Sequence, residues 1–240
     1  MPHDSAGNVH EAYPSVYRDR FGEGDDRHPA LRQVRHAESH PGRAESPEGE
    51  AFLDTPYYKA FDSLLSSARL DALLEQYGYT LVFYPHIEMQ KHLSRFHAPS
   101  ERVVLADSTL YDVQQLLLDC ALLVTDHSSV FFDVAFLRKP VVYYQFDEEE
   151  FRKYHYQKGY FDFRRDGFGP VCTTQEALLG ALTESFENGM EMQTEYVQRT
   201  ERFFPLHDGN NCRRTLEAIA RLKERNKKHA AESESLSVHL

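Results

Sequence analysis

The stretch LLVTDHSSVFFDVAFLRKPVVYY, residues 122–144, decides the fold. Residues 122–124 form a continuous apolar run, which is typical of a parallel strand covered on both faces, and residues 141–144 repeat the pattern. A polar turn at residues 126–129 and an apolar segment of helical length separate the two runs. We therefore expect a strand, a turn, a helix and a second strand that lies parallel to the first in one sheet.

The turn between this strand and this helix is the first candidate site, because open α/β folds bind ligands at the carboxyl edge of the sheet. Ser128 or Ser129 is expected to cap the helix, and the remaining hydroxyl and the free backbone N–H groups can donate to an anion such as a phosphate. A plain capping turn at Asp126–Ser129 explains the same residues about equally well. One helical turn later, Asp133 can accept hydrogen bonds from a ribose diol, although acidic residues in helices are more often solvated.

A histidine after an earlier strand is the second candidate. Residues 79–84 form a short β-type run that ends in Pro85 and His86. His86 is therefore expected at the carboxyl edge, on the same rim as the serine turn. An imidazole there can act as general acid or base, or can donate to a phosphoryl oxygen. A single histidine after a strand is more often structural, and the rim shared with the serine turn reduces that preference.

Composition limits the class of protein. The chain has 240 residues, of which 41% are hydrophobic, enough for one sizeable domain with tails. The formal net charge of -11 argues against nucleic acid as the main partner, because duplex binding needs a basic face. The three cysteines are widely spaced without a CxxC pair, which indicates neither a disulfide framework nor a zinc site. The residues imply no metal and no cofactor.

The sequence also limits the relation to a membrane. No apolar run approaches the ~20 residues that a membrane helix needs. The first ten residues lack the basic and hydrophobic parts of a signal peptide. We therefore expect a cytoplasmic protein with at most peripheral membrane contact.

Composition divides the chain into three parts. Residues 1–50 are rich in Pro, Gly, His and charged residues with almost no apolar periodicity, which is typical of a disordered arm. The histidines of this arm have no metal-ligand spacing. Residues 51–222 are expected to form the folded domain, and residues 223–240 a charged C-terminal tail.

The apolar periodicity predicts alternating helices and strands between residues 55 and 222. The pattern predicts helices over 55–78, 87–92, 113–118, 174–186, 191–203 and 211–222, and strands over 79–84, 103–106, 122–124 and 141–144. This alternation predicts an α/β fold with a Rossmann-like parallel sheet and flanking helices. The polar, aromatic segment 145–171 is long for a connection, so we expect a functional loop there.

Four blocks in this order resemble the CDP-glycerol glycerophosphotransferase family, the teichoic acid polymerases and primases. They are YGYTLVFYPHIEMQ (77–90), LLVTDHSSVFFDVAFLRKPVVYYQFD (122–147), KGYFDFRRDGFGPV (158–171) and DGNNCRRTLEAI (208–219). The likeness extends over about residues 52–222. It implies a GT-B-like architecture, of which this chain corresponds to the C-terminal half, a Rossmann-like domain that binds the CDP-glycerol donor.

The resemblance implies a role for each matching residue. The family's PH motif falls on His86, which would be catalytic. The family's D-x-S-S-x-x-x-D motif falls on Asp126, Ser128, Ser129 and Asp133. The serine turn would hold the donor's phosphates, and Asp133 would hold the ribose.

The resemblance also implies a reaction. Gly169 and Pro170 match the family's GP in the loop that closes over the donor. An acceptor hydroxyl on a polymeric or lipid-linked chain end would attack the β-phosphorus of CDP-glycerol, and CMP would leave. Positioning and charge stabilisation would carry this reaction without a required metal. Two features depart from the family: residues 1–51 match no HGTP-type amino-terminal domain, and His127 stands where tyrosine is usual.

Three functions are compatible with these residues. The first is the donor-binding half of a glycerophosphotransferase, which either works with a separate N-terminal domain or chain at the inner face of the plasma membrane or is left over from a disrupted enzyme. The second is a catalytically silent nucleotide-binding module, and the third is another GT-B nucleotide-sugar enzyme. An adjacent reading frame for the missing domain would favour the first over the second. Preference for a CDP-sugar or UDP-sugar over CDP-glycerol would favour the third.

Overall fold

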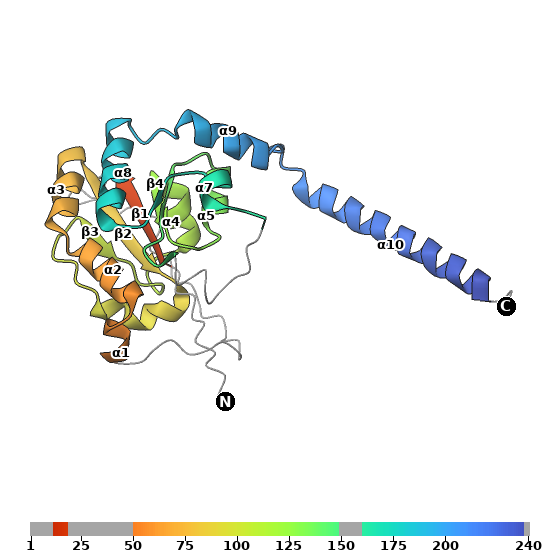
Figure 1. Cartoon of the computed structure of the whole chain (residues 1–240), viewed down its shortest axis with the longest axis horizontal. Coiled ribbons are helices and arrows are strands. Elements are labelled where there is room, and N and C mark those ends of the chain that lie inside the picture. Colours follow the sequence, from red (N-terminus) through yellow and green to blue (C-terminus); the bar gives the residue numbers. More distant parts are fainter. Residues whose placement is uncertain (1–11, 19–49, 149–159, 238–240) are drawn as a thin grey trace. The chain divides into compact units, whose positions relative to one another are not determined.

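The computed structural model describes residues 12–18, 50–148 and 160–237 (Figure 1). The chain divides into two compact units, residues 1–200 and 201–240. The division falls inside helix α9 (Thr194–Phe203), whereas the sequence places a boundary after residue 222.

A six-stranded sheet in the order β3-β2-β1-β4-β5-β6 forms the centre of the first unit. The strands are β1 (Ala12–Arg18), β2 (Tyr79–Pro85), β3 (Val103–Leu105), β4 (Leu122–Thr125), β5 (Val141–Tyr144) and β6 (Val171–Cys172). β2 pairs in parallel with β3, and β4, β5 and β6 pair in parallel with one another. The parallel pairing of β4 and β5 and the α/β class are therefore confirmed, and the strand order is that of a doubly wound sheet.

Strand β1 corrects the sequence interpretation. The segment Ala12–Arg18 lies within the expected disordered arm, yet it forms the central strand, antiparallel to both β2 and β4. The expectation of a disordered arm is therefore wrong for these seven residues. Pro14 argues against a central strand in the sequence, because proline removes a ladder donor and is rare in central strands. Glu50, the last residue of the expected arm, begins a helix, and residues 1–11 and 19–49 lie outside the described residues.

The pairing of β1 with β4 is short for the same reason. Two residue pairs join these strands, and the next pair in register would be Pro14 and Val124. Leu123 N donates to Pro140 O on the β5 side. Because backbone groups alternate sides along a strand, Val124 directs its own toward β1. Pro14 has no N–H to donate to the Val124 carbonyl, so the ladder ends there.

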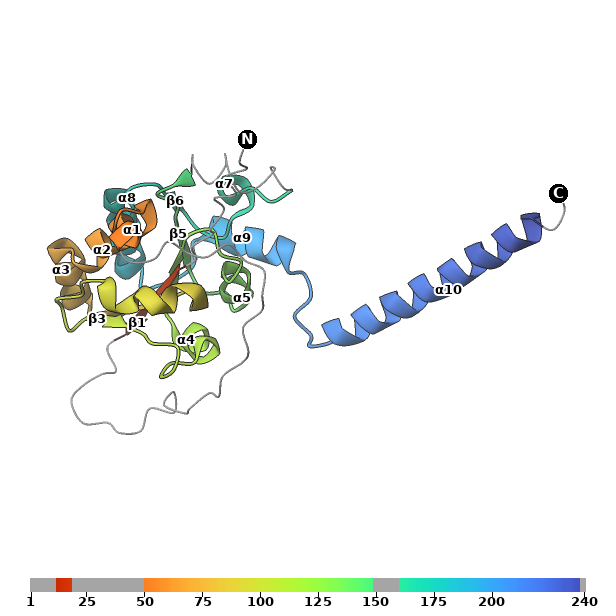
Figure 2. The same cartoon turned by 90° about the horizontal axis from the view of Figure 1, so that it is seen from below.

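Helices cover both faces of the sheet (Figures 1 and 2). One face carries α1 (Glu50–Leu53), α2 (Pro56–Leu65), α3 (Ala68–Tyr77), the 3₁₀ helix η1 (Ile87–Arg95) and α8 (Gln175–Glu187), and the other α4 (Val113–Asp119), α5 (Phe131–Phe136) and α7 (Phe163–Asp166). Alternate side chains of β2 pack on opposite faces of the sheet. Leu81 and Phe83 belong to the larger buried core, and Val82 belongs to a smaller one together with Cys120. This alternation is the two-residue period of a strand.

Two predicted helices differ in detail. The helix expected over 55–78 is broken into α2 and α3, because the Ser67 side chain caps α3 by accepting a hydrogen bond from Leu70 N at 3.3 Å. Gly78 closes α3 in the left-handed conformation, with φ 68°, as expected. The residues after His86 form a 3₁₀ helix.

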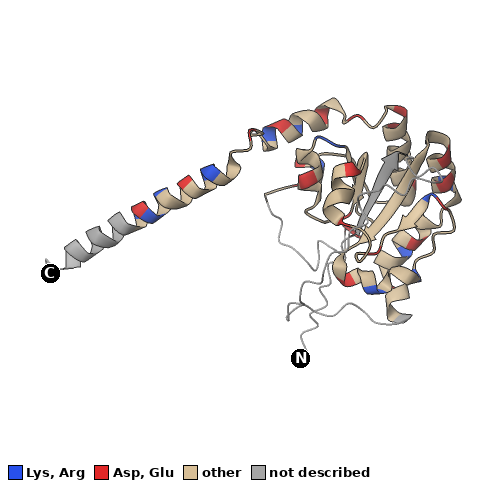
Figure 3. Ribbon diagram, turned by 180° about the vertical axis from the view of Figure 1, so that it is seen from behind, with Lys and Arg blue, Asp and Glu red and all other residues tan. Residues whose placement is uncertain are grey.

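The second unit contains α10 (Asn211–Ser237). The helix continues for fifteen residues beyond the predicted end at Leu222, so the expected charged tail is helical through Ser237. Glu217 forms i,i+4 pairs with Arg213 and Arg221, each at 4.0 Å, which favour a helix over a frayed end. Figure 3 shows acidic and basic residues interspersed along its described part.

Candidate functional site

The two candidate turns lie at the same edge of the sheet, as the sequence predicts. His86 follows the carboxyl end of β2, and Asp126 follows the carboxyl end of β4. Only β1 lies between β2 and β4 in the sheet. Neighbouring strands are ~4.8 Å apart, so strands separated by one other lie about 10 Å apart, which is within the reach of one nucleotide diphosphate.

The turn after β2 fixes the His86 ring. His86 is the N-cap of η1, and its Nδ1 accepts a hydrogen bond from Glu88 N at 3.3 Å. A backbone N–H can only donate, so in the neutral ring the proton is on Nε2. The His86 side chain is half-buried and lines a groove. The ring therefore presents an N–H donor.

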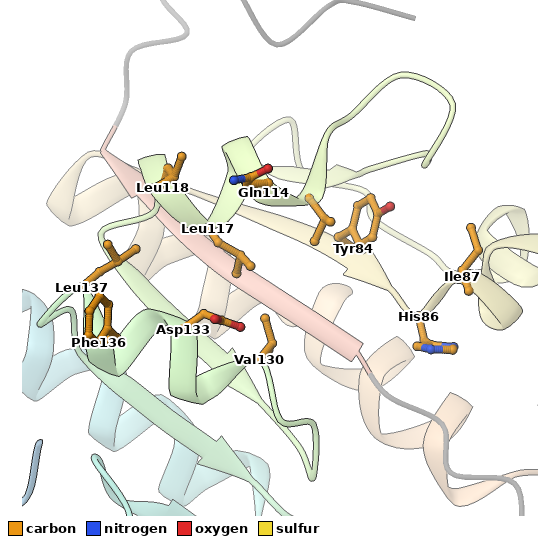
Figure 4. Close-up of a pocket in the computed structure, with 11 residues that line it drawn as sticks. Tyr84, His86, Ile87, Gln114, Leu117, Leu118, Val130, Asp133, Phe136 and Leu137 are labelled. Atoms are coloured by element: carbon orange, nitrogen blue, oxygen red, sulfur yellow. The ribbon is translucent and has the colours of Figure 1, made fainter. Parts of the chain in front are cut away.

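That groove has a volume of about 610 Å³ and lies between α4 and α5. Most of its described lining is apolar, and the polar members are Tyr84, His86, Gln114 and Asp133. Figure 4 shows His86 at the tip of β2 and Asp133 on α5, on opposite sides of the β1 ribbon. A largely apolar cleft with a few convergent polar groups is the usual form of a small-molecule site.

Asp133 and Tyr84 are the groove's polar groups besides His86 and the amide of Gln114. Asp133 is exposed on α5, so its carboxylate can accept hydrogen bonds without the cost of burial. Burial, together with the carboxylates of Asp112 and Asp107, raises the pKa of Tyr84. The phenol therefore stays protonated at neutral pH and can donate or accept a hydrogen bond.

The serine turn is built differently from the prediction. Asp126 and Ser128 are buried, and Asp126 Oδ1 accepts from Ser128 N at 3.2 Å. Ser128 Oγ accepts from Val130 N at 3.3 Å. Val130 is the N-cap of α5 and makes no side-chain cap bond, so the prediction that Ser128 or Ser129 caps this helix is wrong. The side chains instead stabilise the turn before the helix, which is where short polar residues compete with helical bonding.

Ser129 and His127 occupy opposite environments. Ser129 is exposed, whereas the His127 side chain is 6% exposed and its Nε2 lies 3.0 Å from Asp147 Oδ1. The His127 ring also meets Phe163 edge-on, with centroids 6.1 Å apart. His127 therefore anchors the turn to the segment after β5. Of the turn, Ser129 alone offers an exposed hydroxyl.

Gly169 and Pro170 lie away from the rim that carries His86 and the serine turn. They precede β6 and stand beside the amino end of β5, where Pro170 O accepts from Tyr143 N at 2.9 Å. A Cβ at Gly169 would lie 1.6 Å from Val141 O. The structure thus brings His86 and Asp133 to one groove, and Gly169 and Pro170 are at the opposite edge of the sheet. Asp126, Ser128 and Ser129 share the rim with His86 but are not among the described residues that line the groove.

Comparison with known proteins identifies the family. The family described as CDP-Glycerol:Poly(glycerophosphate) glycerophosphotransferase matches residues 46–221. The chain belongs to this family. Its resemblance to the glycerophosphotransferases is therefore confirmed.

Individual proteins are similar to this chain over a part of their length. The minor teichoic acid biosynthesis protein GgaB of Bacillus subtilis is 31% identical over 176 residues, which cover 73% of this chain and 19% of that protein. A teichoic acid glycerol-phosphate transferase of Staphylococcus aureus is 31% identical over 45% of this chain and 28% of that protein. The chain thus spans less than a third of the length of these two relatives. A solved structure of the wall teichoic acid polymerase TagF covers 68% of this chain and 39% of its own, with 22% identity and a TM-score of 0.49.

Two residues of the site escape sequence reasoning. Lys139 Nζ donates to Cys120 O at 2.8 Å, to Leu117 O at 3.4 Å and to Leu118 O, and so holds the end of α4, one wall of the groove. Gln90 links the last residue of β2, Pro85, to Ser108 in the segment that follows β3. Gln90 closes the YPHIEMQ block of the family resemblance, which is the one signal that could have found it. Lys139 lies within the block 122–147 of the same resemblance, but its partners are about 20 residues away, so the sequence does not indicate which groups it binds.

Two negative findings concern the described part of the chain. Among those residues, no group of three or more His, Cys, Asp or Glu side chains is placed to hold a metal ion. In the same residues, no helix has both the length and the apolar character required to cross a membrane.

Proposed function

We propose that this chain is the CDP-glycerol-binding part of a glycerophosphotransferase for teichoic acid or a related cell-surface polymer. The observation that carries the proposal is the family match over residues 46–221, within which His86 and Asp133 line one groove at the carboxyl edge of the sheet. Residues 51–222 would then be the donor domain. A polymeric or lipid-linked acceptor would place the protein in the cytoplasm at the inner face of the plasma membrane, in peripheral contact.

The proposed reaction is a phosphoryl transfer. The oxygen of an acceptor hydroxyl forms a bond to the β-phosphorus of CDP-glycerol, and the bond from that phosphorus to the bridging oxygen breaks. CMP leaves with that oxygen, and the hydroxyl proton is released to solvent or a base. The protein's contribution is the positioning of the two substrates and the stabilisation of charge on the transferring group.

The geometry of His86 supports a donor role in this reaction. With Nδ1 engaged by Glu88 N, the Nε2–H of the neutral ring is available to a phosphoryl oxygen that gains negative charge. A fixed donor in a partly apolar groove costs little reorganisation when the charge develops. His86 is therefore proposed as the catalytic residue.

The other family positions are proposed to bind the donor. Asp133, exposed beside the groove, would accept from the ribose hydroxyls. Ser129 would donate to a phosphate, and the Asp126 and Ser128 side chains would support its turn from within. Gly169 and Pro170 would serve the donor loop from a distance, by fixing the start of β6 against β5.

Calorimetry with purified protein tests donor binding. Titration with CDP-glycerol, CDP and UDP-glucose is expected to give binding of the two CDP compounds and none of UDP-glucose. Preference for the UDP-sugar would remove the glycerophosphotransferase assignment in favour of another nucleotide-sugar enzyme. Absence of any nucleotide binding would remove the donor-domain assignment altogether.

Release of CMP tests transfer. The protein is assayed with CDP-glycerol and a lipid-linked glycerol phosphate acceptor, alone and with a candidate N-terminal domain as a separate chain. Release is expected in at least the combined sample, and His86→Ala should abolish it while nucleotide affinity stays within about twofold. Binding without release in every combination would make the chain a silent nucleotide-binding module.

A further inference from the structure

The side chain of Gln90 makes three hydrogen bonds at the carboxyl ends of β2 and β3. Its Nε2 donates to Pro85 O at 3.0 Å and to Ala106 O at 3.3 Å, and its Oε1 accepts from Ser108 N at 3.1 Å. Its backbone N–H donates to His86 O at 3.2 Å. Gln90 therefore contacts the His86 turn through both its backbone and its side chain.

These bonds continue the β2–β3 ladder beyond a proline. In that parallel ladder, Phe83 O accepts from Ala106 N at 2.9 Å. The next step would have Pro85 N donate to Ala106 O, but proline has no N–H. Gln90 Nε2 supplies the missing donor to Ala106 O. A ladder without this amide would leave the carbonyl of a fully buried residue short of a partner.

The amide also bridges the following step of the ladder. A regular parallel pair would next join Ser108 N to Pro85 O. Here Ser108 N donates to Gln90 Oε1, and Gln90 Nε2 donates to Pro85 O. One side-chain amide thus stands in for a peptide group between the two strands. This function needs two donations and an acceptor from the same planar group, which the side-chain amide of Gln90 provides.

The Gln90 bonds affect the position of His86, which directly follows Pro85. The bond from Glu88 N to His86 Nδ1 sets the ring tautomer, and at 3.3 Å it is long, so small changes in the turn break it. The direction in which the chain leaves β2 decides whether this bond forms. Gln90 fixes that direction from Pro85 O on one side and from His86 O on the other.

We propose that Gln90 is a positioning residue, which holds His86 in the orientation and the tautomer that present Nε2–H to the groove. The inference rests on the proposed function only where it concerns transfer, because the tautomer of His86 can be measured without substrate. A misplacement of ~1 Å at a reacting group can cost about a hundredfold in rate.

Imidazole NMR of the full chain tests the proposal. The protein is labelled with ¹⁵N-histidine, and His86→Ala assigns the His86 signals. At a pH where the ring is neutral, the Nε2–H tautomer should dominate in the wild type, and Gln90→Met should give a mixture of both tautomers. Methionine retains the volume of the side chain and removes its donors and acceptor.

Gln115 on α4 provides the matched control. Its Nε2 donates to Asp119 Oδ2 at 2.8 Å, and it is not among the described residues that line the groove. Gln115→Met should leave the His86 signals unchanged. If folded Gln90→Met gives the His86 tautomer of the wild type, Gln90 is merely structural and the proposal is overturned.

Two more variants keep the test decisive. If Gln90→Met fails to fold, Gln90→Asn retains the amide one methylene short of its partners and should give a partial shift in tautomer; an unchanged tautomer would overturn the proposal. In the active assembly, Gln90→Met should reduce turnover at least about tenfold with CDP-glycerol affinity within about twofold. Failure of the wild type to bind CDP-glycerol would refute the proposed function and leave the NMR result standing.

Discussion

Gly169 lies directly against Val141, so that a Cβ atom at position 169 would stand 1.6 Å from Val141 O and 2.6 Å from its carbonyl carbon. The contact holds the chain before β6 against the first residue of β5. The atoms that a Cβ at position 169 would meet belong to the Val141 backbone and not to the end of a flexible side chain. They cannot move aside without shifting β5. The glycine of the family's GP motif therefore has a packing reason in this fold.

Gly169→Ala should lower the free energy of unfolding by about 3 kcal/mol, because the added methyl overlaps the β5 backbone. Urea unfolding followed by circular dichroism measures the change. Gly180→Ala in α8 is the control, since nothing lies within 4 Å of its added Cβ, and it should stabilise the protein by about 0.5–1 kcal/mol. Equal stability of Gly169→Ala and wild type would contradict the contact.

Lys139→Met should lower the free energy of unfolding by about 2 kcal/mol, because it removes the charged donor shared by the last carbonyls of α4. Chemical denaturation measures it. Lys59→Met is the control: its bridge to Asp54 is exposed, with a 3.3 Å separation, and its loss should change stability by less than about 0.5 kcal/mol. The same loss in both variants would mean that the α4 end does not depend on Lys139.

Alkaline pH should destabilise the fold through its buried thiols. Burial raises the pKa of Cys120 and of Cys172 from 9.0 to about 11 each. The unfolded chain releases these protons first, so their contribution is fully present below about pH 9 and is lost as the pH rises toward 11. Urea midpoints between pH 8 and 11 should fall, and the fall should be smaller in Cys120→Ala. Cys212 is exposed, so a slope that Cys212→Ala reduces equally would rule out the buried thiols.

Replacement of Ser128 and of Ser129 by alanine should have different effects. Ser129→Ala is expected to weaken CDP-glycerol binding about tenfold without changing the melting temperature, because its hydroxyl is exposed. Ser128→Ala should lower the melting temperature, because its buried Oγ accepts from Val130 N. Calorimetric titration and thermal unfolding give the two readouts. Unchanged affinity in the double variant Ser128→Ala and Ser129→Ala would refute a phosphate role for the turn.

Asp133→Asn should weaken CDP binding about tenfold, since an amide accepts from a ribose diol less strongly than a carboxylate does. Asp119→Asn on α4 loses the same charge outside the groove's described lining and should bind CDP as the wild type does. Titration of both variants with CDP measures the two affinities. If the two variants lose affinity equally, the effect is one of net charge and not of a contact.

The sequence predicted those elements whose cause is local. The apolar runs of β4 and β5 and the helix between them follow from residue type alone, and Gly78 marks the end of α3 because its left-handed conformation suits glycine. Placement of His86 and Asp126 on one rim also follows, since both come after parallel strands. Ser67 escaped prediction because a capping serine inside an apolar helical pattern resembles any exposed helical residue.

By itself, then, the sequence determined the α/β class, the family, and the two strand ends where His86 and the serine turn stand, because each follows from residue types and their order along the chain. Only the tertiary structure decided that Ala12–Arg18 forms the central strand, that Asp126 and Ser128 turn inward, and that Gln90 completes the ladder past Pro85. The central strand and the completed ladder depend on backbone groups far away in the chain. The lack of an N–H on proline has an effect only where another strand lies beside the proline and offers a carbonyl in register.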